Sequence, residues 1–419
     1  MGYLSHTTSR KRLPRFLIYQ VLADATDTDL LRGIMVTRQY DRAILAYKNI
    51  LNGDYVSDPE LKLMIARHTA LFEGYADAKR ENSMNMNKKN INYHVILLIV
   101  IFAVTAIAQC ETIGQKQAES IAEGFVQAGD DIALYYQISG TGPDTIVVLH
   151  GGPGLNFGYL APDLLPLAES HTLIFYDQRG SARSTLITDS SLVHIDKHIE
   201  DIEALQRHFG LQNMFLLGHS WGAGLAARYA LKYPDQLSGM ILVGAMAPRY
   251  EPHWDKFRRN RSAWMDDEVR SRGTELVAER NAATDPAEYQ RLCRKVAKIS
   301  FAGMFHDPHD PENFKRMQGD YCSPALSPEA RESSRLVSIL TWRSIENWNW
   351  LDDFHETDVP VLVIHGKSDP MPLASAREWA DAFPYARFAV IENAGHKPYI
   401  ERPDEFFQTV TEFLQKIMQ

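Results

Sequence analysis

Residues 213–224 read N-M-F-L-L-G-H-S-W-G-A-G, and this stretch decides the fold. Ser220 stands between Gly218 and Gly222 in a G-x-S-x-G pattern, with an apolar run before it and a helix-forming run after it. A strand, a tight turn and a helix are the context that a nucleophile elbow requires. Glycines on both sides let the backbone turn where a side chain would clash. The alternative is a glycine turn with an incidental serine, so the partners of Ser220 decide between the two.

Short apolar runs alternate with amphipathic stretches from about residue 120 onward. The candidate buried strands are Thr145–Leu149, Leu173–Tyr176, Met214–Leu217, Met240–Val243, Val361–Ile364 and Phe388–Ile391. Helical stretches such as Ala223–Tyr233 and Pro403–Ile417 lie between these runs or follow them. Continuous apolar strands separated by helices predict an α/β fold, a mainly parallel sheet with helices on both faces.

One interval, residues 248–358, shows no clear strand and is rich in Trp, Arg, Glu and Asp. It predicts several helices inserted between the strands of a core formed by residues 120–247 and 359–419. Insertions over the carboxyl edge of a parallel sheet commonly form a lid on the site, so we expect a helical cap here.

Two further residues stand where the partners of Ser220 are needed. A serine hydroxyl is a weak nucleophile and requires a histidine base that is itself oriented by a carboxylate. Asp369 follows the run V-P-V-L-V-I-H-G-K-S, and His396 follows F-A-V-I-E-N-A-G, so each comes after its own strand. A lone Asp before Pro is more often a turn residue and a lone His more often structural. The order Ser, acid, His, each at a strand end, predicts a catalytic triad.

Acyl transfer also needs N–H donors for the developing oxyanion. One is expected from Trp221, the residue after the serine. The second is expected from the loop H-G-G-P-G at residues 150–154, which follows a buried strand directly. Pro153 has no N–H, so Gly152 is the best donor and Gly151 stands behind it.

The motifs H-G-G-P-G at 150–154 and D-Q-R-G-S-A-R-S at 177–184 resemble the proline iminopeptidase branch of the α/β-hydrolases, peptidase family S33. The resemblance covers roughly residues 120–419 and implies an α/β-hydrolase fold and release of N-terminal residues from peptides. Ala182 stands where the family usually has Gly. G-H-S-W-G differs from the G-G-S-W-G of strict prolyl aminopeptidases, and His219 therefore argues against a strict proline specificity.

The resemblance also implies acidic cap residues that hold the free α-amine of a peptide. Glu346 in W-R-S-I-E-N-W is the first candidate and Glu268 in M-D-D-E-V the second, although either can equally face solvent. Three tryptophans, Trp342, Trp348 and Trp350, either wall an apolar substrate pocket or form the core of the cap.

The leading hypothesis is thus an aminopeptidase of proline iminopeptidase type. The first alternative is an esterase or lactonase on small acyl substrates with the same triad, and the second is a non-catalytic binding protein. Ser220 argues against an epoxide hydrolase or a haloalkane dehalogenase, because either would need an Asp nucleophile in the elbow. We expect a small peptide or acyl substrate and no cofactor or metal, because the chain has neither a C-x-x-C pair nor a G-x-x-x-x-G-K-[ST] loop. A net charge of -9 argues against a nucleic-acid partner. The sequence leaves the oligomeric state open.

An export-like segment lies at residues 88–110, K-K-N-I-N-Y-H-V-I-L-L-I-V-I-F-A-V-T-A-I-A-Q-C. Its apolar run is shorter than the roughly 20 residues of a membrane-spanning helix, so no stable span is expected. A basic flank and an A-x-A site before Gln109 instead predict a signal peptide. The alternative is a buried core helix or strand, which the lack of a polar face disfavours. Cys110 also allows a lipoprotein, although Gln109 stands where a small residue is expected.

The position of this segment raises a question about the start of the chain. Residues 1–87 read as a helical upstream segment of unknown role, and Met84 or Met86 is an alternative start. Export would place the protein in the periplasm or outside the cell; otherwise it is cytoplasmic or membrane-associated. In an exported chain Cys293 and Cys322 could pair, although sequence alone does not show that they approach each other.

Overall fold

Eight strands form one sheet in the computed structural model, which describes residues 121–129, 131–354 and 356–418. The strands are β1 (Ala122–Gln127), β2 (Ala133–Ser139), β3 (Thr145–Leu149), β4 (Thr172–Tyr176), β5 (Met214–His219), β6 (Leu237–Val243), β7 (Val361–Gly366) and β8 (Ala386–Ile391). Their order across the sheet is β1-β2-β4-β3-β5-β6-β7-β8. All six predicted strands are present, and β3 has the predicted bounds.

The sheet is parallel from β4 to β8, and only β1 and β2 run against their neighbours. This confirms the predicted mainly parallel sheet. β1 and β2 were absent from the prediction because they form an antiparallel edge with partly exposed residues, whereas the central strands are buried on both faces.

Helices cover both faces of the sheet, as predicted. The α-helices of the core are α6 (Ala161–Leu164), α7 (Ile195–Phe209), α8 (Trp221–Lys232), α14 (Leu373–Ala382), α15 (Pro398–Glu401) and α16 (Pro403–Ile417). Side chains alternate along each strand, so Val147 packs with α7 and α8 while Val148 packs with α6 and α16. The sheet therefore has an apolar core on each side.

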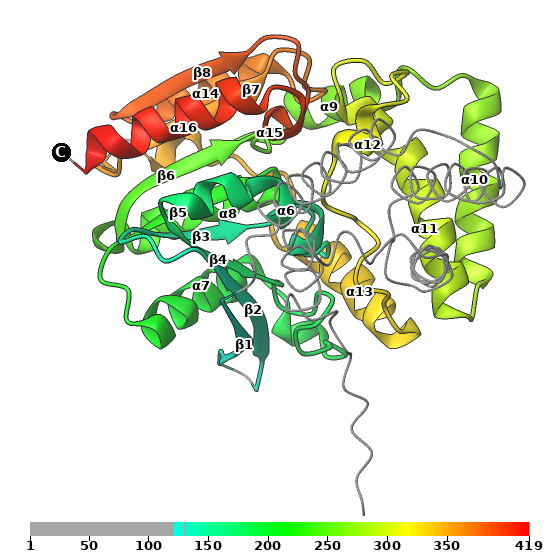
Figure 1. Cartoon of the computed structure of the whole chain (residues 1–419), viewed down its shortest axis with the longest axis horizontal. Helices are drawn as coiled ribbons and strands as arrows, with labels where there is room; N and C mark the ends of the chain where they lie inside the picture. The colour runs from blue at the N-terminus through cyan, green and yellow to red at the C-terminus, as the bar shows by residue number, and fades with distance from the viewer. Residues whose placement is uncertain (1–120, 130, 355, 419) are drawn as a thin grey trace, which may run out of the picture. The chain divides into compact units, whose positions relative to one another are not determined.

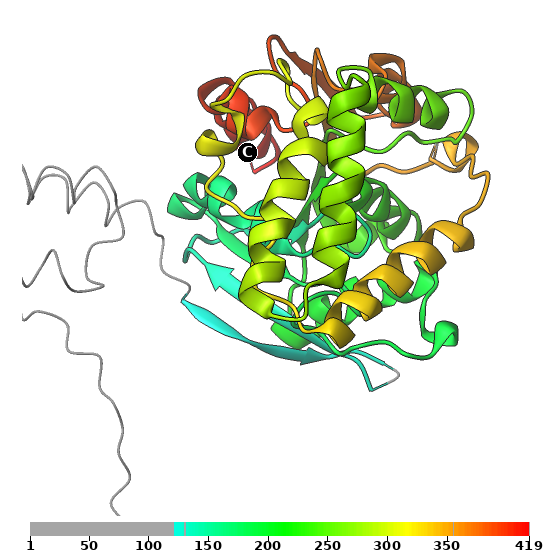
Figure 2. The ribbon, with the colours of Figure 1, turned by 90° about the vertical axis from the view of Figure 1, so that its right-hand side faces the viewer.

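Five helices separate β6 from β7 and form the cap. They are α9 (His253–Ser262), α10 (Asp267–Ala282), α11 (Pro286–Ser300), α12 (Asn313–Arg316) and α13 (Pro328–Ser344). Six short 3-10 helices complete the described structure: η1 (Phe157–Tyr159), η2 (Leu165–Glu169), η3 (Ser190–Leu192), η4 (Pro234–Gln236), η5 (Ala302–Met304) and η6 (Leu351–Asp353). Figure 1 shows α10, α11 and α13 at the end of the sheet toward which the arrowheads of β6 and β8 point. In Figure 2 the same helices lie in front of the sheet. The cap therefore lies over the carboxyl edge of the strands.

A disulfide between Cys293 and Cys322 joins α11 to the segment that precedes α13, with Cα atoms 5.9 Å apart. Two of the tryptophans, Trp348 and Trp350, are buried, and the indole N–H of Trp348 donates to Ala247 O at 2.9 Å. These two side chains therefore form part of the core between cap and sheet.

The predictions for residues 1–87 and 88–110, Cys110 included, fall outside the described residues. Within the described ranges, none of the helices has the length and apolar character needed to span a membrane.

Candidate active site

Ser220 lies at a sharp turn between β5 and α8. Its backbone has φ 58° and ψ -117°, a conformation that non-glycine residues rarely adopt. The flanking glycines permit close packing at the turn: a Cβ on Gly222 would lie 2.1 Å from Leu149 O, and one on Gly218 would lie 2.4 Å from Gly222 O. Neither position has room for a side chain. The backbone is thus that of a nucleophile elbow, with Ser220 half-buried at its tip.

His396 and Asp369 form a buried pair. The Nδ1–H of His396 donates to Asp369 Oδ2 at 2.8 Å, and the Met371 N–H donates to Asp369 Oδ1 at 2.8 Å. Burial raises the pKa of Asp369, but the charges of His396 and His365 and these hydrogen bonds outweigh it and leave the pKa below its usual value. Asp369 is therefore an ionised carboxylate that fixes the orientation of the His396 ring.

The end of β6 connects the serine to this pair. The Ser220 N–H donates to Val243 O at 3.0 Å. The next residue is Gly244, on which a Cβ would lie 3.1 Å from His396 Nδ1 and 3.2 Å from Asp369 Oδ2. The His396 Nε2 atom is buried and has no hydrogen-bond partner among the residues that the structure describes. The fold thus gathers the three predicted residues at one edge and leaves one imidazole nitrogen available to accept a proton.

His219 binds two parts of the site together. Its Nε2–H donates to His396 O at 3.0 Å, and its Nδ1 accepts from the Tyr159 hydroxyl at 2.7 Å. Tyr159 in turn accepts the Gly151 N–H at 2.7 Å. Burial and the neighbouring His396 hold the pKa of His219 well below its usual value, so the ring is neutral, as this pattern requires. A continuous chain of hydrogen bonds therefore joins the H-G-G-P-G loop to the loop that carries His396.

This chain of hydrogen bonds also selects between the two candidate donors in the H-G-G-P-G loop. The Gly151 N–H is engaged by Tyr159. Gly152 has φ 132°, a conformation that favours glycine. Its N–H donates no hydrogen bond within the described part of the chain, and the same holds for Trp221 at the first position of α8. A Cβ on Gly151 would lie 3.1 Å from Ser220 Cβ, so the loop runs beside the serine.

The two motifs of residues 150–154 and 177–184 interlock. The Gln178 N–H donates to His150 Nε2 at 3.1 Å, and the Gln178 side chain donates to His150 O at 2.8 Å. The indole N–H of Trp221 donates to Gln178 Oε1 at 3.0 Å. Burial lowers the pKa of His150 to about 4, so its ring is neutral and its Nδ1–H donates to Gly151 O. Gln178 therefore connects His150, which follows β3, to Trp221, which follows β5, beside the serine.

Ala182 has φ 44°, in the left-handed region. The resemblance places a glycine at this position, and the backbone explains why, since glycine adopts this conformation without a steric cost.

Lys397, the neighbour of His396, is fully buried. Its Nζ lies 4.7 Å and 4.5 Å from the ring centroids of Phe305 and Tyr321. Burial lowers the pKa of Lys397 to about 7, although Asp163 and Glu401 oppose the shift.

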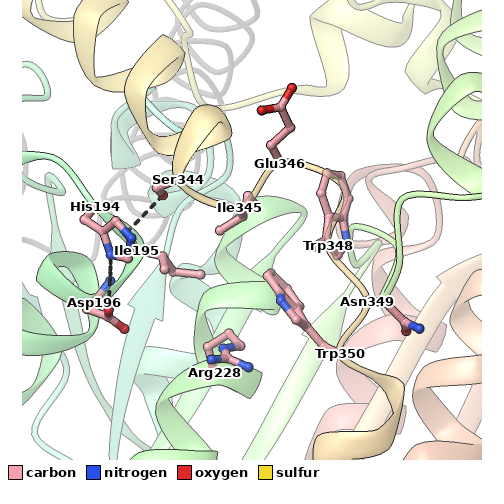
Figure 3. Close-up of a pocket in the computed structure, with 10 residues that line it drawn as sticks. All are labelled: His194, Ile195, Asp196, Arg228, Ser344, Ile345, Glu346, Trp348, Asn349 and Trp350. Atoms are coloured by element: carbon pink, nitrogen blue, oxygen red, sulfur yellow. Dashed lines mark hydrogen bonds and ion pairs between the residues drawn. The ribbon is translucent and has the colours of Figure 1, made fainter.

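Both acidic candidates of the cap are exposed. Glu268 lies in the first turn of α10. Glu346 follows α13 and lines a cavity of about 340 Å³ with Arg228 and Trp350. Figure 3 shows its carboxylate pointing away from these two side chains. None of the predicted triad residues lines this cavity.

Sequence reasoning missed Tyr159, Gln178 and Lys397, and it gave His219 no structural role. Tyr159 is 60 residues from His219 and belongs to η1, so no local pattern connects the two. Gln178 lies inside a motif that was recognised as a whole. Among the described residues no group of His, Cys, Asp and Glu side chains is placed to hold a metal ion.

Comparison with known proteins gives a consistent family assignment. The sequence profile of the alpha/beta hydrolase fold family matches residues 144–403. The proline iminopeptidase of Heyndrickxia coagulans is 25% identical over 296 residues, covering 70% of this chain and 99% of the relative. That of Clostridioides difficile is 27% identical over 307 residues, covering 70% and 98%. The crystal structure of a proline iminopeptidase from Mycobacterium smegmatis superposes with a TM-score of 0.53 at 22% identity, covering 71% and 98%. This structural likeness concerns the fold alone.

Proposed function

The chain belongs to the α/β-hydrolase fold family and is a hydrolase, and we propose that it works by acyl transfer through Ser220, His396 and Asp369. The observation that carries this proposal is the serine elbow, whose strained backbone stands beside a buried His–Asp pair with a free Nε2. Strained backbone of this kind persists where it serves a site.

In the proposed reaction Ser220 Oγ attacks the substrate carbonyl while His396 Nε2 takes the hydroxyl proton. Asp369 stabilises the imidazolium that forms and remains ionised. The tetrahedral intermediate then collapses as His396 returns the proton to the leaving group. In the second half-reaction His396 takes a proton from water while the water attacks the acyl-enzyme. The second tetrahedral intermediate then collapses, His396 returns the proton to Ser220 Oγ, and the acid product is released.

The oxyanion of each tetrahedral intermediate would accept hydrogen bonds from the N–H groups of Gly152 and Trp221. Both groups are without other partners in the described structure, whereas the Gly151 N–H is occupied. Removal of one such donor costs a factor of about 100 to 1,000 in kcat in other enzymes of this kind.

As the specific activity we propose an aminopeptidase of proline iminopeptidase type, acting on small peptides. The support is the two curated relatives, which carry that name and align over nearly their whole length. Glu346 stays our first candidate for the residue that holds the substrate α-amine, and Glu268 the second.

The alternative is an esterase or lactonase on small acyl substrates. The exposed positions of Glu346 and Glu268 favour it, because an exposed carboxylate is a weak anchor for a charged amine. The choice of substrate distinguishes the two activities, because a peptidase of this type needs a free α-amine on its substrate and an esterase does not.

The test compares proline p-nitroanilide with p-nitrophenyl butyrate on the wild type, Ser220→Ala and Glu346→Gln. We expect the wild type to cleave the anilide and Ser220→Ala to lose both reactions. Glu346→Gln should weaken anilide cleavage and spare the ester. Full activity of Ser220→Ala would refute the mechanism, and cleavage of the ester alone would favour the alternative.

We further propose that the protein is exported. Disulfides are rare in the reducing cytosol, and the Cys293–Cys322 bond therefore fits a chain with a signal peptide. N-terminal sequencing of protein from its native host tests this: a mature chain that begins at Gln109 is expected, and retention of residues 1–108 would contradict it.

A further inference from the structure

The cap and the H-G-G-P-G loop enclose a second cavity, of about 270 Å³. Gly154, the last residue of the loop, and Leu155 after it line the cavity on one side, and α10, α11 and α13 line it on the other. Tyr321 also lines it, next to Cys322, which the disulfide ties to α11. Both cysteines of the disulfide, Cys293 of α11 and Cys322, thus line the cavity.

Two arginines, Arg280 of α10 and Arg331 of α13, line this cavity together with Tyr289 of α11. The guanidinium carbon of Arg331 lies 3.8 Å from the ring centroid of Tyr289, and that of Arg280 lies 5.9 Å from it. All three side chains are half-buried. Stacking on the ring holds the Arg331 guanidinium in a defined plane and leaves its edge available.

Neither arginine forms an ion pair among the described residues. Arg280 donates to Asn281 Oδ1, and Arg331 donates through Nε to Ser327 O at 3.3 Å. Three nearby carboxylates have arginine partners of their own, in the pairs Glu279–Arg272, Glu288–Arg291 and Glu332–Arg335. The carboxylate of Glu329 is held by its own backbone N–H and by Ser327, and it also interacts with the charge of Arg331. The cavity therefore offers positive charge to an anion.

The cavity also lies close to the proposed nucleophile. Tyr321 stacks on Tyr159 with ring centroids 4.7 Å apart, and Tyr159 bonds the Gly151 N–H. Consecutive Cα atoms are about 3.8 Å apart, so the loop from Gly151 beside Ser220 to Leu155 in the cavity spans at most about 15 Å. A peptide of roughly four extended residues covers this distance.

We propose that Arg280 and Arg331 bind the carboxylate of the substrate, so that the preferred substrates are short peptides with a free C-terminal carboxylate. This inference rests on the proposed peptidase function, because it places the scissile bond at Ser220 and the acid end in the cap. The planar fork of an arginine matches a carboxylate with two parallel hydrogen bonds, and a partly buried, stacked guanidinium loses little freedom on binding.

The experiment compares the pentapeptide Pro-Ala-Ala-Ala-Ala, which has four residues after the scissile bond, with its C-terminal amide on the wild type, Arg331→Gln and Arg280→Gln. We expect the wild type to favour the free acid by about 10-fold to 100-fold in kcat/KM, the range of a charge-assisted hydrogen-bond pair. Each variant should lose most of this preference, because kcat/KM for the free acid falls toward that for the amide. Arg331→Lys, which retains the charge, should keep part of it.

Arg335→Gln is the matched control, since Arg335 lies one turn further along α13, is exposed and pairs with Glu332. It should keep the full preference. Equal kcat/KM of the wild type for acid and amide would overturn the inference, as would variants that lose both substrates equally while remaining folded by circular dichroism.

A binding measurement separates this inference from the peptidase function. Titration calorimetry of Ser220→Ala with the acid and the amide needs no turnover. Tighter binding of the acid, abolished by Arg331→Gln, would uphold the carboxylate site even if proline p-nitroanilide were not cleaved. Equal or absent binding of both peptides would refute the site even if the anilide were cleaved.

Discussion

Replacement of Tyr159 by phenylalanine tests the hydrogen-bond chain behind the site. The Tyr159 hydroxyl accepts the Gly151 N–H and donates to His219 Nδ1, both at 2.7 Å. Tyr159→Phe keeps the ring and its stacking on Tyr321 but removes both hydrogen bonds. The variant therefore isolates the contribution of one hydroxyl to the two loops that it joins.

The size of the effect follows from the two atoms left without partners. A buried donor or acceptor that loses its hydrogen bond costs about 1–3 kcal/mol, so the free energy of unfolding should fall by about 2–6 kcal/mol. His219 cannot compensate by switching tautomer, because its Nε2–H is needed by His396 O. The released Gly151 also loosens the loop that carries Gly152. We expect kcat to fall by about 10-fold to 100-fold, less than the loss of a whole oxyanion donor, with little change in KM.

Urea unfolding followed by tryptophan fluorescence measures the stability, and steady-state cleavage of proline p-nitroanilide or p-nitrophenyl butyrate measures kcat. Tyr399→Phe is the matched control: the Tyr399 ring packs edge-on against His219 at 5.6 Å, but its buried hydroxyl has no hydrogen-bond partner among the described residues. That variant should unfold within about 1 kcal/mol of the wild type, or be more stable. If Tyr159→Phe behaved like Tyr399→Phe in both assays, the hydrogen-bond chain would have no role.

Three further variants test separate features. Ala182→Gly should raise the free energy of unfolding by up to about 1 kcal/mol in urea, because the left-handed backbone strains alanine; a clear loss would contradict this. Burial lowers the pKa of Lys397 to about 7 in the folded chain, whereas an unperturbed lysine has a pKa of about 10. Between these pH values Lys397 is protonated in the unfolded chain and neutral in the folded chain, so the free energy of unfolding increases with pH. The unfolding free energy of the wild type minus that of Lys397→Met should therefore increase by about 1.4 kcal/mol per pH unit from about pH 7 to 9, and a flat difference would contradict the shift. Serine at both Cys293 and Cys322, 29 residues apart, should cost about 3–4 kcal/mol by the loop-entropy estimate and speed proteolysis of the cap, while dithiothreitol should affect only the wild type.

The central strands were predictable because each is buried on both faces and so reads as a continuous apolar run, as Thr145–Leu149 does. The edge strands β1 and β2 mix exposed and buried residues and gave no such signal. Asp369 and His396 were found for a related reason: each follows a strand of a parallel sheet, and the carboxyl ends of such strands meet at one edge. No comparable rule predicts which residues of the helical cap lie close together. The sequence therefore did not show whether Cys293 pairs with Cys322.

The structural role of His219 could not be predicted from the residues around it in the sequence. His219 is the residue by which G-H-S-W-G differs from the G-G-S-W-G of strict prolyl aminopeptidases. On the sequence alone it therefore argues against a strict proline specificity. In the structure its ring nitrogens face Tyr159 and the backbone of His396, and neither described cavity includes it in its lining. Because both ring nitrogens are bonded within the protein, we expect any effect of His219 on specificity to act through the positions of the two loops. The direct substrate contacts that we propose lie instead in the cap, where Arg280 and Arg331 line the cavity beside the H-G-G-P-G loop.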